Sequence, residues 1–293
     1  MPRNSWIRAA DVDRFMQTTI PYLSTEPAAN NLLLTVFDRL RTDGSHAFGE
    51  RDPQLLTWVG PDGSPEGAVV RTPPFPYILS AISADAVHAL IDLLLEPGAD
   101  LDGREANITS DSEEAFVSAW TAHTGYRPRV IERNRLYRLD ELVAPDPMPA
   151  GKARQARSAD VPIAARWIEE FWGELSHAVR PDASTAAPAI AEARIAEGAF
   201  WLWLDGDGTP VSLAGHTPIV AGASRIGPVY TPRALRGRGY AGAVTAAASR
   251  ALLSQGADEV LLFTDLANPT SNALYQRIGY REVSDRVRLQ LKG

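Results

Sequence analysis

Two arginines and two glycines alternate in the segment that is richest in phosphate-binding residue types. The segment is Arg236-Gly237-Arg238-Gly239, and it stands directly before an alanine-rich stretch. Glycine lets a backbone approach oxygen atoms without a Cβ in the way, and the free amide groups at the start of a helix attract anions. The arginines add positive charge. We therefore expect a loop that binds phosphate groups.

A strand and a helix must position this loop. The sequence predicts a strand that leads into the loop, a helix that follows it, and further elements that complete a helix-flanked sheet. The expected elements of the second half are a helix at 160–175, strands at 199–204, 210–215 and 224–230, a helix at 239–253, a strand at 260–264, a helix at 270–277 and a strand at 287–291. This order predicts a mixed sheet with helices on its faces.

A dinucleotide-binding unit is one interpretation of the glycines. Gly237-x-Gly239-x-x-Gly242, with Asp265 at the end of the next strand, matches that fingerprint formally. However, six residues separate Tyr230 from Gly237, and only 28 residues follow Asp265. The fingerprint follows its strand closely and begins a long domain, so the spacing disfavours this interpretation.

A second interpretation rests on two motifs in sequence order. Arg236-x-x-Gly239-x-Ala241 resembles the acetyl-CoA loop of the GNAT (GCN5-related N-acetyltransferase) superfamily, and residues 268–280 resemble its second signature, an Asn-rich helix start followed by Leu-Tyr and Gly-Tyr. The resemblance covers residues 154–291. It implies an α/β (α+β) fold, with a mixed, mostly antiparallel sheet flanked by helices, and central strands that splay apart. It also implies an acetyl-CoA-dependent N-acetyltransferase.

The resemblance implies where acetyl-CoA binds. The pantetheine arm is expected along the fourth strand, the pyrophosphate on the amides of the loop, and the thioester near the start of the helix at 270–277. The residues expected to bind the cofactor are Val229, Tyr230, Thr231, Arg236, Gly237, Arg238, Gly239, Tyr240, Ala241, Asn268 and Asn272. Pro228 suits a strand whose pairing is interrupted.

The resemblance also assigns a proton donor. Tyr275 matches the tyrosine that protonates the departing thiolate of CoA, and an ordinary phenol pKa of about 10 suits that role. A buried core aromatic is the structural alternative. The base that deprotonates the amine is left open among His216, Glu174, Glu170 and His177, because the fourth strand carries no carboxylate.

The chain is long enough for two lobes, and a proline-rich segment divides it. Three prolines within residues 145–149 predict a linker at 144–151, between a lobe at 1–143 and an acetyl-CoA-binding domain at 152–293. A strand and a Gly-Tyr pair recur at a constant offset of 154 residues, which indicates a tandem repeat. The first copy has no glycine-rich loop and carries Thr121 where the second has Tyr275, so we expect a degenerate lobe.

Composition excludes several classes of function. The chain has no cysteine, which rules out disulfides and thiol catalysis, and no motif predicts a resident metal. The net charge of −7 disfavours nucleic-acid or anionic-membrane partners, and the N-terminus carries no signal-like apolar run, so we expect a cytoplasmic, bacterial protein, monomeric or homodimeric.

The acceptor is expected to be a primary amine of a small molecule. Residues 1–150 carry a formal charge of −9, which favours a cationic acceptor such as a polyamine or an aminosugar. Two alternatives remain: a regulatory module that binds acyl-CoA without catalysis, and acetylation of protein N-termini or lysines.

Overall fold

The computed structural model describes residues 4–96, 105–175 and 183–291, the side chains of the last range from residue 186 onward. The chain divides into two compact units, one of residues 1–136 and 283–293, the other of residues 137–282. The division differs from the linker predicted at 144–151. The strands β6 and β12 each begin in one unit and end in the other, so the boundary falls inside two strands and not at the prolines.

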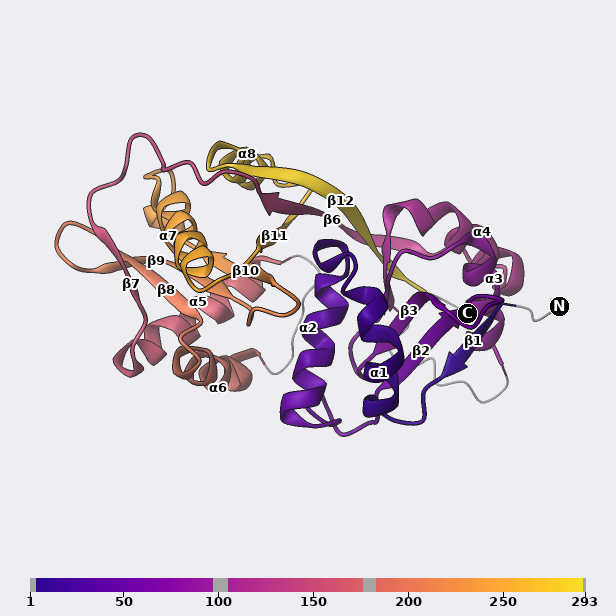
Figure 1. The fold of residues 1–293 in the computed structure, drawn as a ribbon. Helices are drawn as coiled ribbons and strands as arrows, with labels where there is room; N and C mark the ends of the chain where they lie inside the picture. Colours follow the sequence, from indigo (N-terminus) through magenta and orange to yellow (C-terminus); the bar gives the residue numbers. More distant parts are fainter. Residues whose placement is uncertain (1–3, 97–104, 176–182, 292–293) are drawn as a thin grey trace. The chain divides into compact units, whose positions relative to one another are not determined.

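The first unit is a sheet with helices on both faces (Figure 1). Its strands follow the order β1-β2-β3-β4-β5-β12-β6. Its elements are β1 (Ser5–Arg8), α1 (Val12–Leu23), α2 (Pro27–Asp43), β2 (Gln54–Val59), β3 (Pro65–Arg71), β4 (Tyr77–Leu79), α3 (Ala84–Leu94), β5 (Glu105–Thr109), α4 (Glu113–Thr124), β6 (Arg129–Leu139) and the end of β12 (Tyr280–Gln290).

Neighbouring residues of β2 show which helices cover which face. The Thr57 hydroxyl lies 2.6 Å from that of Thr19 on α1, whereas Leu56 packs in the core cluster that contains Leu90 of α3 and Trp120 of α4. Successive side chains of a strand point to opposite faces. Helices α1 and α3 therefore cover opposite faces of this sheet.

The second unit repeats this plan. Its strands follow the order β7-β8-β9-β10-β11, with β10 and β11 parallel and the other pairs antiparallel. Its elements are β7 (Lys152–Gln155), α5 (Val161–Glu174), α6 (Ala183–Ala196), β8 (Phe200–Leu204), β9 (Pro210–His216), β10 (Ala223–Tyr230), α7 (Tyr240–Ser254), β11 (Glu259–Asp265) and α8 (Pro269–Arg277). The mixed, mostly antiparallel sheet that the sequence predicts is confirmed.

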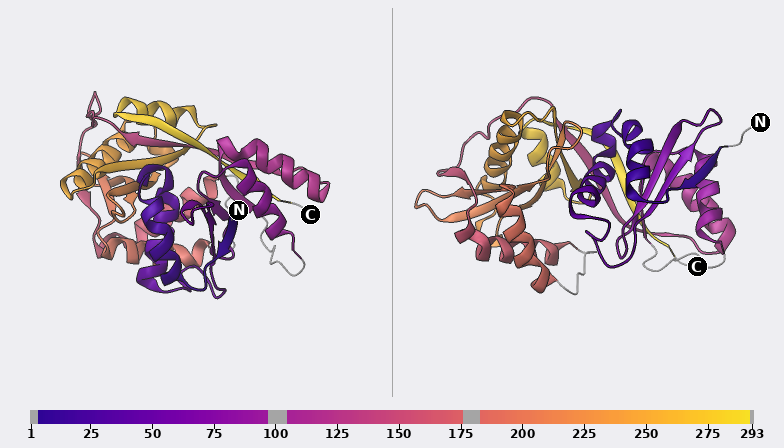
Figure 2. Two further views of the ribbon diagram at one scale, coloured as in Figure 1. Left: turned by 45° about the vertical axis from the view of Figure 1, so that its right-hand side comes forward. Right: turned by 60° about the horizontal axis from the view of Figure 1, so that its bottom comes forward.

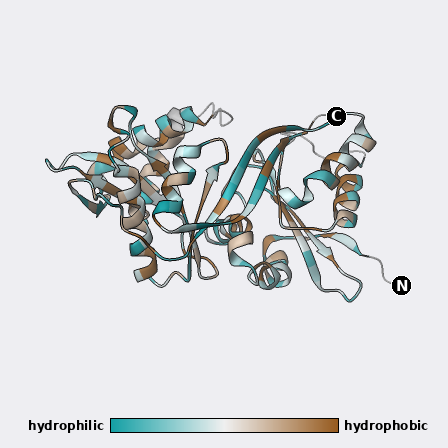
Figure 3. Ribbon diagram, turned by 90° about the horizontal axis from the view of Figure 1, so that it is seen from above, coloured by the Kyte–Doolittle hydropathy of each residue, from teal (hydrophilic) through white to brown (hydrophobic). Residues whose placement is uncertain are grey.

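Alternation along β8 separates the two helical layers of this unit. Phe200 and Leu202 pack with Trp167 of α5, whereas Trp203 packs with Val244 of α7. Figure 2 shows the layers of each unit from two further sides, and Figure 3 shows hydrophobic and hydrophilic residues following one another along single strands. The apolar residues thus form separate cores above and below the sheet.

Two elements of the second unit were not predicted from the sequence. Strand β7 is only four residues long, and α6 buries Ala187, Ala191 and Ile195. Their spacing of four residues is helical, but alanine gives a weak apolar signal and Pro188 interrupts the pattern.

The predicted repeat is present: β5 begins at Glu105 and β11 at Glu259, an offset of 154 residues.

No helix in the described ranges is long and apolar enough to cross a membrane. The same ranges hold no cluster of three or more histidine or carboxylate side chains that could bind a metal ion.

Candidate active site

The two central strands of the second unit separate halfway along their length. β10 and β11 pair in parallel from Ala223 and Glu259 to Ile226 and Leu262, and no pairing follows. On the other side of β10, the register with β9 shifts between Ile226 and Val229. The predicted splay is confirmed, and so is the interrupted pairing at Pro228. Backbone groups of β10 beyond Ile226 therefore do not bond to β11.

The loop after β10 presents free amide groups. Gly237 and Gly239 have φ angles of 78° and 81°, and the first helical hydrogen bond of α7 runs from the Ala243 amide to the Gly239 carbonyl at 3.1 Å. Within the described residues, the amides from Gly237 to Gly242 donate to no acceptor. Gly239 stands at the N-cap and has no side chain to cap them. The predicted anion-binding arrangement is therefore geometrically available.

The two arginines of the loop have different surroundings. Arg236 donates from Nη2 to both oxygens of Glu174, at 2.7 and 2.8 Å, and from Nε to the Thr231 carbonyl at 2.9 Å. Arg238 is exposed, and among the described residues its side chain donates only one long hydrogen bond, to the Ala234 carbonyl at 3.5 Å. From the sequence, we expected the positive charge of both arginines to help bind phosphate. Arg236 instead holds the loop against α5, and Arg238 remains exposed beside the amides.

Three of the residues expected to bind the cofactor lie at the end of β10 or directly after it. Tyr230 is buried beside the Trp167 ring, with centroids 6.5 Å apart, and burial together with a hydrogen bond to Glu170 raises its pKa to about 12. Thr231 is buried, and its hydroxyl lies 2.8 Å from that of Ser212. Val229 is half-buried. Tyr230 and Thr231 therefore serve to fix the strand end with their side chains.

Tyr275 lies on α8 with its side chain buried. The residue is 8% exposed, and burial raises its pKa to about 12. Its ring meets the Tyr280 ring edge-on, at 6.1 Å between centroids, and its hydroxyl bonds to no described residue. Tyr280, by contrast, shares a 2.7 Å hydrogen bond with Ser249. The Tyr275 phenol is thus protonated at neutral pH, with its O–H not committed to a described partner.

The two asparagines of α8 stabilise the start of that helix. Asn268 caps it by accepting from the Ser271 amide at 3.0 Å. Asn272 donates to the Asp265 and Asn268 carbonyls and accepts from the Tyr137 hydroxyl at 2.9 Å. We expected both side chains to face pantetheine and thioester. The side chain of Asn272 is occupied by these internal bonds, which leaves it no free donor.

The candidate bases differ in their chemistry. His216 is 6% exposed, its Nδ1 lies 3.0 Å from the Thr217 carbonyl, and burial lowers its pKa. Because a carbonyl only accepts, Nδ1 carries the proton and the lone pair is on Nε2. Glu174 accepts from Arg233 and Arg236, and although desolvation opposes them, these bonds lower its pKa. Glu174 is therefore a weak proton acceptor. His177 lies outside the described residues.

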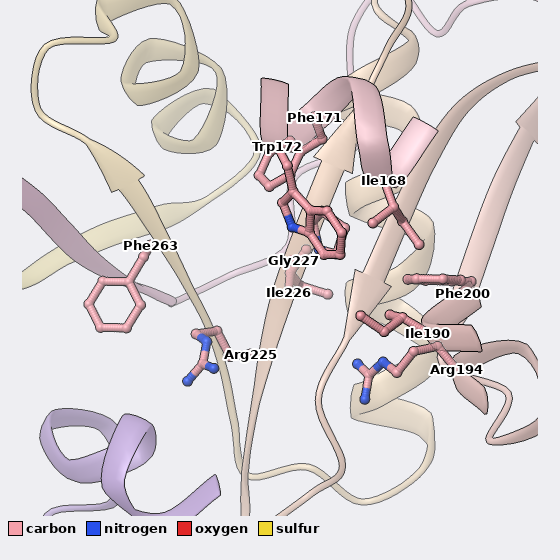
Figure 4. Close-up of a pocket in the computed structure, with 11 residues that line it drawn as sticks. Ile168, Phe171, Trp172, Ile190, Arg194, Phe200, Arg225, Ile226, Gly227 and Phe263 are labelled. Carbon is pink, nitrogen blue, oxygen red and sulfur yellow. The ribbon is translucent and has the colours of Figure 1, made fainter. Parts of the chain in front are cut away.

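A cavity of about 250 Å³ lies at the point where the strands separate. Its walls come from α5, α6, β8, β10 and β11, all in the second unit (Figure 4). The lining residues are Ile168, Phe171, Trp172, Ile190, Arg194, Phe200, Arg225, Ile226, Gly227, Pro228 and Phe263. None of the predicted site residues is among them. Arg225 could have indicated this cavity from the sequence, because it is a charged residue in a mostly apolar strand. Arg194 could not, because it lies on α6, the helix that the sequence did not predict.

The corresponding helix start in the first unit, that of α3, is capped by a side chain of the chain itself. Ser83 caps α3 with its own side chain, which accepts from the Ala86 amide at 3.2 Å, and Asp85 puts a negative charge in the first turn. At the end of β4, the buried Arg286 donates to the Leu79 and Asn107 carbonyls at 2.7 and 2.9 Å. In this unit, side chains of the chain itself thus bond to one amide of the helix start and to two carbonyls at the strand ends.

Three comparisons agree with this geometry. The family model described as FR47-like protein matches residues 210–289. A mycothiol acetyltransferase from Clavibacter michiganensis subsp. michiganensis is 28% identical, over 86% of this chain and 88% of its own. A GCN5-related N-acetyltransferase from Sphaerobacter thermophilus superposes with a TM-score of 0.61 at 18% identity, covering 97% of this chain and 94% of that one.

A structure with two such halves is also similar. A tandem GNAT protein from the clavulanic acid biosynthesis pathway covers 98% of both chains, with a TM-score of 0.55 and 13% identity. Both sequence signatures, the splayed strands and these relatives lead to one assignment. The second half of the chain resembles the FR47-like family, and the whole chain has the fold of GNAT acetyltransferases, with two GNAT-like halves.

Proposed function

We propose that the second unit binds acetyl-CoA and transfers its acetyl group to a primary amine of a small molecule. The observation that carries the proposal is the run of free amides from Gly237 to Gly242, next to strands that separate after Ile226. A helix start with unpaired amides attracts the diphosphate of a nucleotide. A Cβ at Gly237 would meet no atom within 4 Å, so the outer side of the loop is open.

Acetyl-CoA fits the residues that are present. The amides and the exposed Arg238 would hold the pyrophosphate, and the unpaired edge of β10 beyond Ile226 would hold the pantetheine arm. When bound, the cofactor supplies an activated acetyl thioester. The cavity begins at Ile226 and Gly227, where the strands part, so it is the natural place for the amine.

In a ternary complex the amine attacks the thioester directly, and two side chains of the chain assist the transfer. His216 is neutral at pH 7, because its pKa is lowered, and its Nε2 can accept a proton. It does not line the cavity and its Nε2 is buried, so the proposal requires a water molecule that enters beside Nε2 to carry the amine proton to it. Tyr275 donates a hydrogen bond to the departing sulfur. Since its pKa of about 12 exceeds that of an alkyl thiol, the phenol stabilises the thiolate by hydrogen bonding and keeps its own proton.

We propose that the first unit does not bind acetyl-CoA. The Ser83 side chain occupies the Ala86 amide in the first turn of α3, and Arg286 occupies the Leu79 and Asn107 carbonyls at the ends of β4 and β5. The acceptor is a small molecule, in keeping with the name of the 28% identical relative, a mycothiol acetyltransferase.

Thiol release tests the proposed activity. Acetyl-CoA and a panel of small primary amines are incubated with the full chain, and free CoA is measured with a thiol reagent, which the protein does not disturb because it has no cysteine. Release that depends on an amine supports the proposal. Acetyl-CoA binding without release for any amine would instead support a regulatory module.

A further inference from the structure

The cavity beside the strand divergence combines an apolar wall with two cations. Nine of its described lining residues are apolar side chains or glycine, and the other two are Arg194 and Arg225. No carboxylate is among them. A volume of about 250 Å³ equals roughly eight water molecules at ~30 Å³ each, which suits a small organic group.

Both guanidinium groups line the cavity, and the charge of Arg194 acts on Arg225. Arg225 lies over the Phe263 ring, 5.8 Å from its centroid, and Arg194 reaches in from α6. In the view of Figure 4, both groups lie below the rings of Phe171 and Trp172. Arg194 also donates to the His216 carbonyl and, at 3.2 Å, to Glu197, which fixes its position.

Charge repulsion between these groups favours an anion. Burial and, to a smaller extent, the positive charge of Arg194 together lower the pKa of Arg225 to about 10. Arg225 is nevertheless charged at neutral pH. Arg194 is already paired with Glu197, so a carboxylate in the cavity would bond chiefly to Arg225, with Arg194 adding to the attraction. A cationic group would increase the repulsion.

We propose that the acceptor amine carries a carboxylate next to an apolar or aromatic body, and that Arg225 and Arg194 bind the carboxylate while Phe171 and Trp172 contact the body. The acceptor class is thus an amino acid or a close analogue. This assignment rests on the proposed acetyl transfer, and it replaces the polyamine or aminosugar that the acidic first half suggested. That expectation came from charge summed over half the chain, whereas recognition depends on the charges that line the site.

Matched amine pairs test the proposal. The pairs are L-phenylalanine with 2-phenylethylamine and L-leucine with 3-methylbutylamine, which differ only in the carboxylate. We expect kcat/KM for acetyl transfer to be at least about tenfold higher for the carboxylated member of a pair. Arg225→Gln should lower that value about tenfold or more for the carboxylated amines only, mainly through KM, and Arg225→Lys should retain part of it. Arg250→Gln, an exposed arginine of α7, is the matched control and should change neither.

A binding experiment decides the same question without turnover. Calorimetry compares 3-phenylpropionate with 3-phenylpropanamide, on the wild type and on the Arg225→Gln variant whose folding is checked by circular dichroism. Tighter binding of the anion that Arg225→Gln abolishes is the expected result. Equal binding of both probes, or equal loss of both, overturns the assignment.

The outcomes separate this inference from the proposed function. If the amines without a carboxylate are acetylated as well as their carboxylated partners, the proposed carboxylate recognition is refuted, but the proposed acetyltransferase activity is not. A preference for succinyl-CoA over acetyl-CoA that depends on Arg225 would place the carboxylate on the acyl group, and would also overturn the inference. Absence of acetyl-CoA binding would refute the proposed function, while the calorimetric pair still decides whether the cavity takes an anion.

Discussion

Both oxygens of Glu174 accept hydrogen bonds from Nη2 of Arg236, which ties the end of α5 to the loop that begins α7. Arg236 is the first residue of the acetyl-CoA loop motif, yet its guanidinium is used for this ion pair. Its Nε also bonds to the Thr231 carbonyl. The motif arginine therefore shapes the loop, and the free backbone amides that follow it are the proposed anion site.

Replacement of Glu174 tests this positioning role. Because the pair is partly exposed, Glu174→Gln should lower the free energy of unfolding at pH 7 by about 1 kcal/mol or less. The pKa of Glu174 is lowered in the folded state, so its contribution is present above the ordinary value of 4.5 and lost as the pH falls below it. Urea titrations at pH 7 and pH 4 measure the difference, with Glu169→Gln on the exposed side of the same helix as the control. A gap between the two variants that persists unchanged at pH 4 would contradict the ion-pair explanation.

Tyr275→Phe should slow catalysis with little effect on stability. The hydroxyl bonds to no described residue, so its removal should leave the melting temperature nearly unchanged, while kcat falls about tenfold or more and KM for acetyl-CoA stays constant. Burial raises the pKa of Tyr275 to about 12, so no loss of rate from its ionisation should appear below about pH 11.

Tyr280→Phe is the matched control for that variant. It removes the buried hydrogen bond to Ser249 and should lower the free energy of unfolding by about 1 kcal/mol without changing kcat. If Tyr275→Phe keeps full kcat, the phenol has no part in the reaction.

The base assignment predicts the pH dependence. A base must be neutral, and the pKa of His216 is lowered by burial, so the acid limb of kcat/KM should have its midpoint below 6.5. His216→Gln should remove that limb and lower kcat. The pKa of His216 is lower in the folded state than in the unfolded chain. The free energy of unfolding should therefore decrease as the pH falls below 6.5. An acid limb that His216→Gln leaves in place would assign the base elsewhere.

Arg286 should be essential to the first unit. Its buried guanidinium donates to Asn107 Oδ1 and to two strand carbonyls, so Arg286→Met leaves buried acceptors unsatisfied and should cost about 3 to 5 kcal/mol. Arg288→Met on the same strand removes only a partly exposed pair with Glu105 and should cost about 1 kcal/mol or less. Chemical denaturation measures both, and equal losses would contradict the role given to Arg286.

Local sequence signals predicted most of the second unit. The glycines at 237 and 239 and the alternation within strands depend on neighbouring residues, and the repeat is a pair of such local patterns 154 residues apart; the structure contains each of them. The ion pair of Arg236 with Glu174 and the cavity of Arg194 and Arg225 join segments far apart in the chain. Such contacts leave no periodic pattern, which is why the sequence assigned Arg236 to phosphate and missed both cavity arginines.

The unit boundary escaped prediction for a related reason. Prolines at 145–149 mark irregular backbone, but compactness is decided by strand pairing, and β12 pairs with β5 from Arg286 to Gln290. The C-terminal residues thereby belong to the first unit. No local signal in residues 283–293 reports which strand they will join.

A calorimetric titration of acetyl-CoA into the full chain tests the central claim most directly. We predict one site per chain, with binding weakened at least tenfold by Arg238→Glu, which puts a carboxylate beside the free amides, and unchanged by Arg250→Glu on the exposed face of α7. No heat of binding with the wild type, or equal affinity in the wild type and in Arg238→Glu, would contradict the account.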